Sequence, residues 1–332
     1  MMNRNLRIAL PLAALVAAAL AGCAPSAEKK TTDTPAAAGA KKKIVVGFSQ
    51  VGAESGWRTA NTQSIRSEAE KRGIDLRFAD AQQKQENQIK AIRTFIAQGV
   101  DVIMFSPVVE PGWEPVLQEA KKAGIPVILA DRAVDVSDES LYVTFIGSDF
   151  VEEGRRAAEW MAKKMNGKAV IAELQGTPGS APAIDRKRGF EEEMKKYPGM
   201  KIVISQTGDF TRAKGKEVME AFLKSPEGAG ITALYAHNDD MALGAIQAIE
   251  AAGKKPGTDI TIVSVDGVKG AFEAMVAGKL NCTVECNPLL GPTLFDAAEA
   301  VAAGKTVPKR IVTKEGVYDQ TQAKELIADR KY

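Results

Sequence analysis

Histidine and cysteine are scarce in this chain of 332 residues, which contains a single histidine, His237, and three cysteines. Protein zinc sites draw several ligands from these residue types, so no metal site is expected. Cys282 and Cys286 are four residues apart. On one extended strand their Cα atoms would lie about 13 Å apart, too far for a disulfide unless the chain turns between them. We therefore favour two buried thiols.

Sequence motifs of catalysis are also missing. His237 has no serine or cysteine nucleophile in a recognised motif. After the first predicted strand, Gly52 and Gly56 lack the G-x-G-x-x-G spacing of a phosphate-binding loop. We predict that the chain is not an enzyme, binds no cofactor and uses His237 in a structural role.

The chain has no strong excess of charge of either sign. Its 44 Lys and Arg residues against 42 Asp and Glu residues give a formal net charge of +2. Part of this charge comes from the N-terminal region, including the cluster 41–43, and no basic face stands out. Nucleic acid is therefore not an expected partner.

Long apolar runs are missing too, apart from one near the N-terminus. That run, 8–20, follows Arg4 and Arg7 and is short of the roughly 18 to 20 residues of a membrane span. A basic start, a short apolar core and small residues before a break are typical of a secretory signal, here 1–22. The ending Leu-Ala-Gly-Cys resembles a bacterial lipobox, which implies lipidation of Cys23. The alternative is an ordinary signal peptide with an incidental cysteine.

The segment that follows, 23–42, is rich in Ala, Pro, Thr and Lys and has no apolar period. Such a composition cannot bury enough surface to fold, so we predict a flexible tether. Lipidation would hold the protein at a membrane, in the periplasm or on the cell surface.

From residue 43 onward, β-like runs alternate with helical segments. The predicted strands lie near 44–48, 76–78, 100–105, 126–129, 142–147, 169–174, 200–205, 231–236 and 260–265. The predicted helices lie near 57–72, 84–98, 113–123, 150–165, 183–196, 212–224 and 239–252. This alternation predicts parallel sheets covered by helices on both faces, in two Rossmann-like α/β domains. No Pro/Gly-rich linker separates the two sets, which suggests several short crossovers between them.

Polar residues gather after several of these strands, where open α/β sheets bind ligands. They follow the first, fourth, eighth and ninth strands, in the segments 49–58, 131–132, 237–240 and 266–267. Each also has a simpler interpretation: Asp131 and Asn238 could cap a turn or a helix, Asp240 could favour a helix N-terminus, and Trp57 could belong to the core.

This combination of side chains suits a polyhydroxylated ring. Hydroxyl groups both donate and accept hydrogen bonds, so Asp, Asn and Arg together can satisfy them. The C–H face of a sugar packs flat against an aromatic ring, for which Trp57 and Phe210 are candidates.

At these residues the chain resembles the periplasmic sugar-binding proteins of the ribose/galactose class, which have the type I fold. The likeness extends from residue 43 to the C-terminus. Several stretches resemble the galactofuranose-binding branch more closely, namely 46–52, 54–58, 82–90, 183–187, 205–212 and 235–241.

The resemblance implies ligand contacts at positions that match the family's site. They are Trp57, Arg58, Asp131, Arg132, Arg186, Phe210, Asn238, Asp266 and Glu285. Glu54 is a further candidate, because with Arg58 and Arg186 it suggests a strongly polar pocket. Ribose-type relatives carry a second aromatic where this chain has Arg58, and a glutamine where it has Cys286. Glu285 matches the galactofuranose-type pattern and is expected to take the glutamine's place.

The resemblance also implies the domain organisation and the partners. Three crossovers near 147–149, 287–288 and 312–314 would join an N-terminal lobe, 43–148 plus 287–313, to a C-terminal lobe, 149–286 plus 314–332. The expected function is that of a monomeric receptor of an ABC sugar importer. It would close on a monosaccharide and deliver it to the membrane permease. The alternative is a sensor of the same fold that signals to a chemoreceptor or kinase.

Overall fold

The computed structural model describes residues 43–332, which form one compact unit. The predicted signal peptide at 1–22, Cys23 and the tether at 23–42 lie outside the described residues. Within 43–332, no helix has both the length and the apolar character needed to cross a bilayer.

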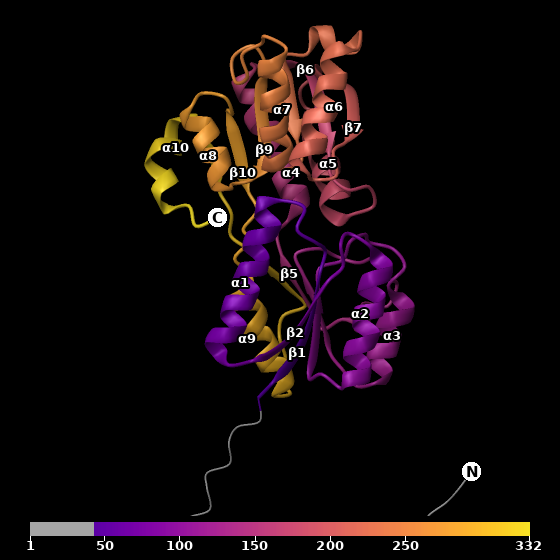
Figure 1. Ribbon diagram of the computed structural model, residues 1–332. Helices are drawn as coiled ribbons and strands as arrows, with labels where there is room; N and C mark the ends of the chain where they lie inside the picture. Colours follow the sequence, from indigo (N-terminus) through magenta and orange to yellow (C-terminus); the bar gives the residue numbers. More distant parts are fainter. Residues whose placement is uncertain (1–42) are drawn as a thin grey trace, which may run out of the picture. The chain divides into compact units, whose positions relative to one another are not determined.

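Two six-stranded sheets organise the described residues (Figure 1). The first has the order β11-β5-β4-β3-β1-β2, and all its strands are parallel. Its strands are β1 (Val45–Gln50), β2 (Asp75–Asp80), β3 (Val102–Phe105), β4 (Val127–Ala130), β5 (Thr144–Gly147) and β11 (Arg310–Val312). We call this sheet and its helices the first lobe.

The second sheet repeats this order as β12-β10-β9-β8-β6-β7, with β12 antiparallel to β10. Its strands are β6 (Lys168–Gln175), β7 (Gly199–Thr207), β8 (Ala233–Ala236), β9 (Thr261–Asp266), β10 (Cys282–Glu285) and β12 (Val317–Asp319). This sheet and its helices form the second lobe. In each lobe the strand order reverses beside the first strand, which creates the kind of crevice where open α/β sheets bind ligands.

Helices cover both sheets. The first lobe has α1 (Gly56–Arg72), α2 (Gln85–Gln98), α3 (Glu114–Lys122) and α9 (Gly291–Ala302). The second has α4 (Phe150–Lys164), α5 (Ala181–Met194), α6 (Arg212–Lys224), α7 (Asp239–Ala251), α8 (Lys269–Val276) and α10 (Gln320–Leu326). Short 3₁₀ turns lie at Glu139–Leu141, Glu227–Gly230 and Ile327–Asp329.

The core of the first lobe follows from the period of two along its strands. Val102 and Met104 pack under α1 and α9, whereas Ile103 and Phe105 pack under α2 and α3. Both faces of the sheet are therefore buried, as its continuous apolar strands predict. The helix ends at Gly73, Gly124 and Gly253 are also confirmed, since each glycine adopts a positive φ beyond its helix.

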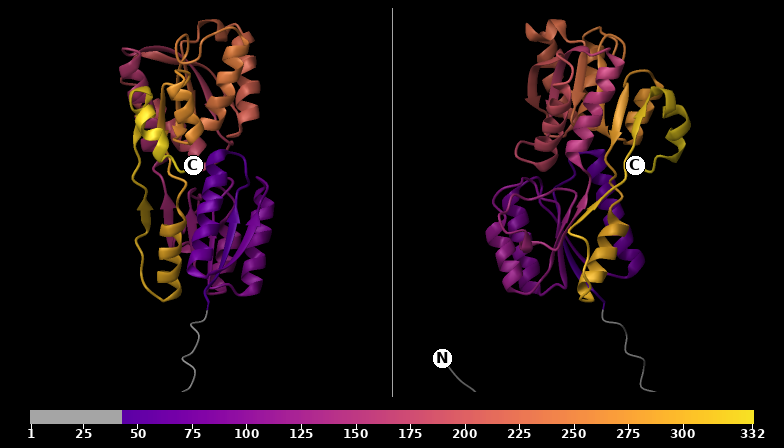
Figure 2. Two further views of the ribbon diagram at one scale, coloured as in Figure 1. Left: turned by 60° about the vertical axis from the view of Figure 1, so that its left-hand side comes forward. Right: turned by 180° about the vertical axis from the view of Figure 1, so that it is seen from behind.

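The chain passes between the two lobes three times (Figure 2). Late segments return to the first lobe: α9 packs beside α1, and β11 pairs with β5. The last strand and helix then rejoin the second lobe, where β12 pairs with β10 and α10 packs against α8. The strands of each sheet therefore come from the segments predicted for its lobe. The exact residues at which one lobe ends and the other begins remain a prediction.

One carboxylate ties all three crossovers together. Glu315 Oε1 accepts hydrogen bonds from Ser148 Oγ at 2.5 Å, Asn287 N at 3.0 Å and Thr313 Oγ1 at 2.6 Å. Each donor comes from a different crossover, so Glu315 fixes the three segments against one another at the junction of the lobes.

Candidate functional site

A small cavity lies between the two lobes, at the carboxyl ends of their strands. First-lobe residues reach it from the segment after β1 and from the end of β4, and second-lobe residues reach it from α5 and from the ends of β8 and β9. The lining side chains are almost fully buried: Arg58 is 2% exposed and Asp131 is 3% exposed. The lobes are therefore closed around the cavity in this structure.

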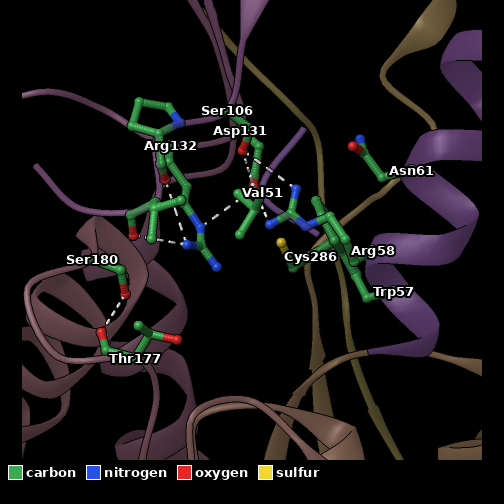
Figure 3. Close-up of polar contacts among 12 residues, drawn as sticks. Val51, Trp57, Arg58, Asn61, Ser106, Asp131, Arg132, Thr177, Ser180 and Cys286 are labelled. Atoms are coloured by element: carbon green, nitrogen blue, oxygen red, sulfur yellow. Dashed lines mark hydrogen bonds and ion pairs between the residues drawn. The ribbon is translucent and has the colours of Figure 1, made fainter. Parts of the chain in front are cut away.

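Arg58 is the centre of the first lobe's contribution (Figure 3). Its Nη2 donates to Asp131 Oδ2 at 2.8 Å, and its Nε donates to Glu54 Oε1 at 3.0 Å. Its Nη1 lies 3.3 Å from both Gln50 Oε1 and Ser106 Oγ. Because every nitrogen of the guanidinium is engaged, Arg58 is held rigidly and in turn fixes the Asp131 carboxylate at the cavity wall.

Arg132 lies beside this pair, with its Nη1 donating to the carbonyl of Val108 at 3.1 Å. Two buried atoms at this wall, Arg132 Nε and Glu54 Oε2, have no hydrogen-bond partner within the described part of the chain. Buried polar atoms are normally paired. The first lobe therefore presents both an unused donor and an unused acceptor, which suits a ligand rich in hydroxyl groups.

Arg186 has the corresponding position in the second lobe. From α5 its Nε donates to Glu153 Oε2 at 2.7 Å, and its Nη1 donates to the carbonyl of His237 at 2.6 Å. Its Nη2 is 3.7 Å from Asp266 Oδ1, at the end of β9. The guanidinium thus links α4, α5, β8 and β9 and faces the cavity from the side opposite Arg58.

Asn238 serves both structure and site. Its Oδ1 accepts from Met241 N at 3.0 Å and so caps α7, while its Nδ2 donates to the carbonyl of Phe210 at 3.1 Å. The capping role weighed for Asn238 is confirmed, and the residue lines the cavity as well. One Nδ2 hydrogen remains for a further acceptor.

Backbone strain concentrates at this site. Asp131, Phe210 and Asp266 have φ values of 67°, 59° and 127°, which residues other than glycine rarely adopt. Such conformations persist only where the surroundings enforce them, and they cluster at functional sites. The tight turn at Asp131 also requires Gly147, because a Cβ there would lie 2.7 Å from the Asp131 carbonyl oxygen.

Three aromatic side chains line the cavity, namely Trp57 on α1 of the first lobe, and Phe150 on α4 and Phe210 before α6 of the second lobe. The indole Nε1 of Trp57 donates to the carbonyl of Cys286 at 2.6 Å, so Trp57 spans the lobes and belongs to the core as well as to the site. Phe210 lies under two guanidinium groups, with Arg132 Cζ 5.4 Å and Arg186 Cζ 5.9 Å from its ring centroid.

The position of Phe210 depends on Gly176. A Cβ at Gly176 would lie 1.9 Å from Cζ of the Phe210 ring, so Gly176→Ala must displace the ring. We expect this variant to bind its ligand about 10- to 100-fold more weakly, a loss of roughly 1.4 to 2.8 kcal/mol, measured by calorimetry. Gly179→Ala would be a poor control, because the positive φ of Gly179 makes any side chain there strained. Gly270→Ala is the matched control, since it is the same substitution on α8, outside the cavity. Equal affinity of Gly176→Ala and wild type would show that the ring's position is unimportant.

Burial and neighbouring charged groups shift the pKa values of the ionisable side chains in the cavity. Burial, together with the positive charge of Arg58, lowers the pKa of Arg132 to about 10. Burial works against ionisation of Glu54, but Arg58 and Arg132 outweigh it and lower the pKa of this carboxyl. Burial raises the pKa of Asp266 well above its ordinary value, despite Arg186.

His237 lies in the second lobe, outside the cavity lining, and makes hydrogen bonds within that lobe. Its Nδ1 accepts from Gly176 N at 3.4 Å, which leaves Nε2 to donate to Glu173 Oε1 at 3.2 Å. Burial lowers the pKa of His237. Burial opposes ionisation of Glu173, but the hydrogen bond from His237 helps to lower that pKa to about 2. The histidine therefore has the structural role that the sequence predicts.

Three potential metal ligands, from Glu153, Cys286 and Glu315, lie within 4.8 Å of one another near the hinge. The arrangement is unsuited to a cation, because Arg186 already pairs with Glu153 and Glu315 Oε1 already accepts three hydrogen bonds. Burial raises the pKa of Glu153 to about 8 and that of the Cys286 thiol well above its ordinary value. Both cysteines within 43–332 are buried free thiols, as the sequence indicates.

Most of the residues that the sequence singles out meet in this cavity. Its lining includes Glu54, Trp57, Arg58, Asp131, Arg132, Arg186, Phe210, Asn238 and Asp266. Glu285 does not belong to this lining. Its carboxylate accepts instead from Tyr318 Oη at 3.0 Å and pairs with Arg330 Nη2 at 2.9 Å. The side chain points to the C-terminal segment because alternate residues of a strand face opposite sides of the sheet, and Cys286 faces the cavity in its place.

Four lining residues, Ser55, Phe150, Pro182 and Cys286, are not among the contacts predicted from the sequence, although Ser55 lies in the segment 49–58 and Cys286 aligns with the glutamine of ribose-type relatives. Phe150 begins α4 three residues after β5 ends, and Pro182 lies in the first turn of α5. Applying the strand-end rule to β5 and β6 as well would have drawn attention to these two positions. Ser55 caps α1, accepting from Arg58 N at 3.0 Å.

Taken together, the cavity offers guanidinium donors, carboxylate acceptors and an amide, between aromatic rings. Such a site can hold a compact neutral molecule that both donates and accepts hydrogen bonds at many positions.

Comparisons with known proteins identify the family of this chain. Residues 46–306 match the periplasmic binding protein domain. The chain is 54% identical, over 87% of its length and 92% of the relative's, to the galactofuranose-binding protein YtfQ of Escherichia coli K12. Two solved structures also align with it, both with a TM-score of 0.85.

The first of these structures is the binding component of the arabinose ABC transporter of Shewanella sp. ANA-3, bound to α- and β-L-arabinofuranose. It is 57% identical and covers 87% of this chain and 96% of its own. The second, from Mycobacterium smegmatis with β-D-fucofuranose, is 61% identical and covers 87% and 95%. The resemblance and the type I fold class read from the sequence are both confirmed. The chain belongs to the periplasmic binding protein family.

Proposed function

We propose that this protein is the substrate-binding component of an ABC sugar importer and that it binds a monosaccharide in its furanose form. The observation that carries the proposal is the closed cavity, where buried arginine and carboxylate groups of both lobes face one small volume. Galactofuranose, arabinofuranose and fucofuranose are named for its relatives. All are small neutral rings that such a cavity suits.

The ligands named for these relatives point to one ring configuration. D-Galactose, D-fucose and L-arabinose have the same configuration at C2, C3 and C4, so their furanose rings are alike. They differ only beyond C4. We infer that the polar wall of the cavity recognises this shared ring and tolerates variation at the exocyclic end.

Binding would proceed by closure of the lobes. Ligand contacts come from Arg58 and Asp131 on one lobe and from Arg186, Asn238 and Asp266 on the other, so only the closed form makes all of them. A ligand shifts the equilibrium by its preference for that form. The closed form would then deliver its sugar to the permease, with no chemical reaction involved. We further propose that the protein acts as a monomer, tethered to the membrane by a lipid on Cys23.

Calorimetry on the purified chain tests the proposed ligand class. L-Arabinose, D-galactose and D-fucose should each bind. D-Ribose and D-arabinose, whose ring hydroxyls are arranged differently, should bind at least about 100-fold more weakly, because misplaced hydroxyls leave buried polar groups unpaired. The furanose is a minor form of these sugars in water. The affinity measured against total sugar is therefore lower than the affinity for the furanose, in proportion to the furanose fraction. Failure of all three sugars to bind, or equal binding of D-ribose, would contradict the proposal.

A further inference from the structure

A carboxylate of the second lobe docks on a helix of the first lobe, outside the cavity lining. Asp240 Oδ2, in the first turn of α7, accepts from the backbone N of Gly56 at 2.7 Å. Gly56 is the first residue of α1, and Asp240 is 5% exposed. This hydrogen bond joins residues 184 positions apart in the sequence, and it requires the two lobes to be together.

The electrostatics of α1 favour this contact. The N-terminus of a helix has unpaired N–H groups and a partial positive charge, which an acidic side chain stabilises. The first turn of α1 contains no acidic residue of its own. Ser55 Oγ caps the N–H of Arg58, and Asp240 of the other lobe accepts the N–H of Gly56. The second lobe therefore supplies an anion to a helix end whose own nearby carboxylate, Glu54, is paired with Arg58.

Asp240 is held ready for the contact by Arg212, at the start of α6. Arg212 Nη2 lies 2.9 Å and Nε lies 3.1 Å from Asp240 Oδ1, which leaves Oδ2 for Gly56. Asp240 and Arg212 both belong to the second lobe, so their ion pair does not depend on closure of the lobes. Only the bond to Gly56 forms when the lobes meet.

We propose that Asp240 determines sugar affinity without touching the sugar, by stabilising the closed form through this interlobe bond. This inference rests on the proposed function, because it assumes that closure accompanies binding. Asp240 is absent from the cavity lining, so its contribution is the same for every sugar that the closed form holds. It changes how tightly the receptor binds but not which sugar it binds, whereas the cavity residues affect both.

The test compares Asp240→Asn with wild type by calorimetry and stopped-flow kinetics, using L-arabinose and D-galactose. The variant keeps the shape of the side chain and loses its charge. We expect both affinities to fall by the same factor, about tenfold, which is the scale of one charge-assisted hydrogen bond at a helix end. The loss should appear as faster dissociation. Glu152→Gln is the matched control, because Glu152 is also in the first turn of its helix and pairs with arginines of that helix.

A second measurement needs no ligand and keeps the inference separate from the proposed function. Spin labels at Glu86→Cys on α2 and Glu217→Cys on α6 report the distance between the lobes, in a chain with Cys23→Ser and with Cys286→Ala, since Cys286 lines the cavity and becomes accessible when the lobes open. Without sugar, Asp240→Asn should shift the distance distribution toward longer values relative to the same labelled chain with Asp240. Arg212→Gln should produce a smaller shift in the same direction.

Two results would overturn the inference. The first is an unchanged distance distribution and unchanged affinity despite a lowered melting temperature, which would confine Asp240 to the stability of α7. The second is a loss of affinity for one sugar alone, which would make Asp240 a ligand contact. A wild-type chain that binds neither sugar would refute the proposed function, while the distance measurement would still decide the role of Asp240.

Discussion

Asp131→Ala is expected to weaken sugar binding by about 100- to 1,000-fold, roughly 3 to 4 kcal/mol, while the chain stays folded. The substitution removes a carboxylate of the cavity wall and takes from Arg58 its partner at 2.8 Å. The buried guanidinium of Arg58 then keeps Glu54 as its remaining close counter-charge. Calorimetry with L-arabinose measures the loss, and circular dichroism checks the fold.

Asp75→Ala is the matched control for this prediction. Asp75 also pairs with an arginine of its lobe, Arg77, at 2.7 Å, but both side chains are exposed and lie away from the cavity. Exposed pairs contribute little, so affinity and stability should stay close to those of wild type. If Asp131→Ala bound sugar as tightly as Asp75→Ala, Asp131 would have no part in the site.

The second large effect is expected at Gly154, where α4 crosses α5. A Cβ at Gly154 would lie 2.1 Å from the carbonyl oxygen of Arg186, and one at Gly189 would lie 2.0 Å from that of Val151. Backbone cannot yield as a side chain can, so Gly154→Ala must separate the two helices. We expect a loss of about 3 kcal/mol or more in the free energy of unfolding and a melting temperature lower by about 6 to 12 °C.

The same substitution should also weaken binding, because Arg186 lies on the helix that is displaced. Gly270→Ala on α8 is the matched control, since its Cβ would meet only the Leu243 side chain, at 3.2 Å. There the better helix propensity of alanine offsets a mild contact, and stability should change by less than about 1 kcal/mol. Thermal unfolding of both variants tests this prediction. If Gly154→Ala were as stable as Gly270→Ala, the close packing of α4 on α5 would be contradicted.

The regular part of the fold could be predicted from the sequence because each element has a strong local signal. Strands such as β3 and β4 are continuous apolar runs, and helices such as α1 end at a glycine with positive φ. No individual element was predicted beyond residue 265, where the structure has α8, β10, α9, β11, β12 and α10. β11 and β12 have three residues each, and none of them is fully buried, so no apolar pattern marks them. Their places in the two sheets depend on long-range pairing that only the family resemblance could suggest.

The site could be predicted to the extent that it follows strand ends. Asp131, Asn238 and Asp266 lie at strand ends or within two residues of them, and the structure brings them to one cavity. Glu285 was placed by the resemblance alone, and the position beside it faces the cavity instead. The interlobe bond of Asp240 could not be read from the sequence, because it depends on how two distant helix ends meet.

The central claim is that the closed cavity holds a furanose ring. A crystal structure of the chain grown with D-galactose tests it most directly. Dissolved D-galactose is mainly the pyranose, so a bound furanose would have to be selected by the cavity. We predict a furanose between Trp57 and Phe210, with its hydroxyl groups hydrogen-bonded to Asp131, Asn238 and at least one of the cavity arginines. A pyranose in the cavity, or sugar bound elsewhere with the cavity filled by water, would contradict it.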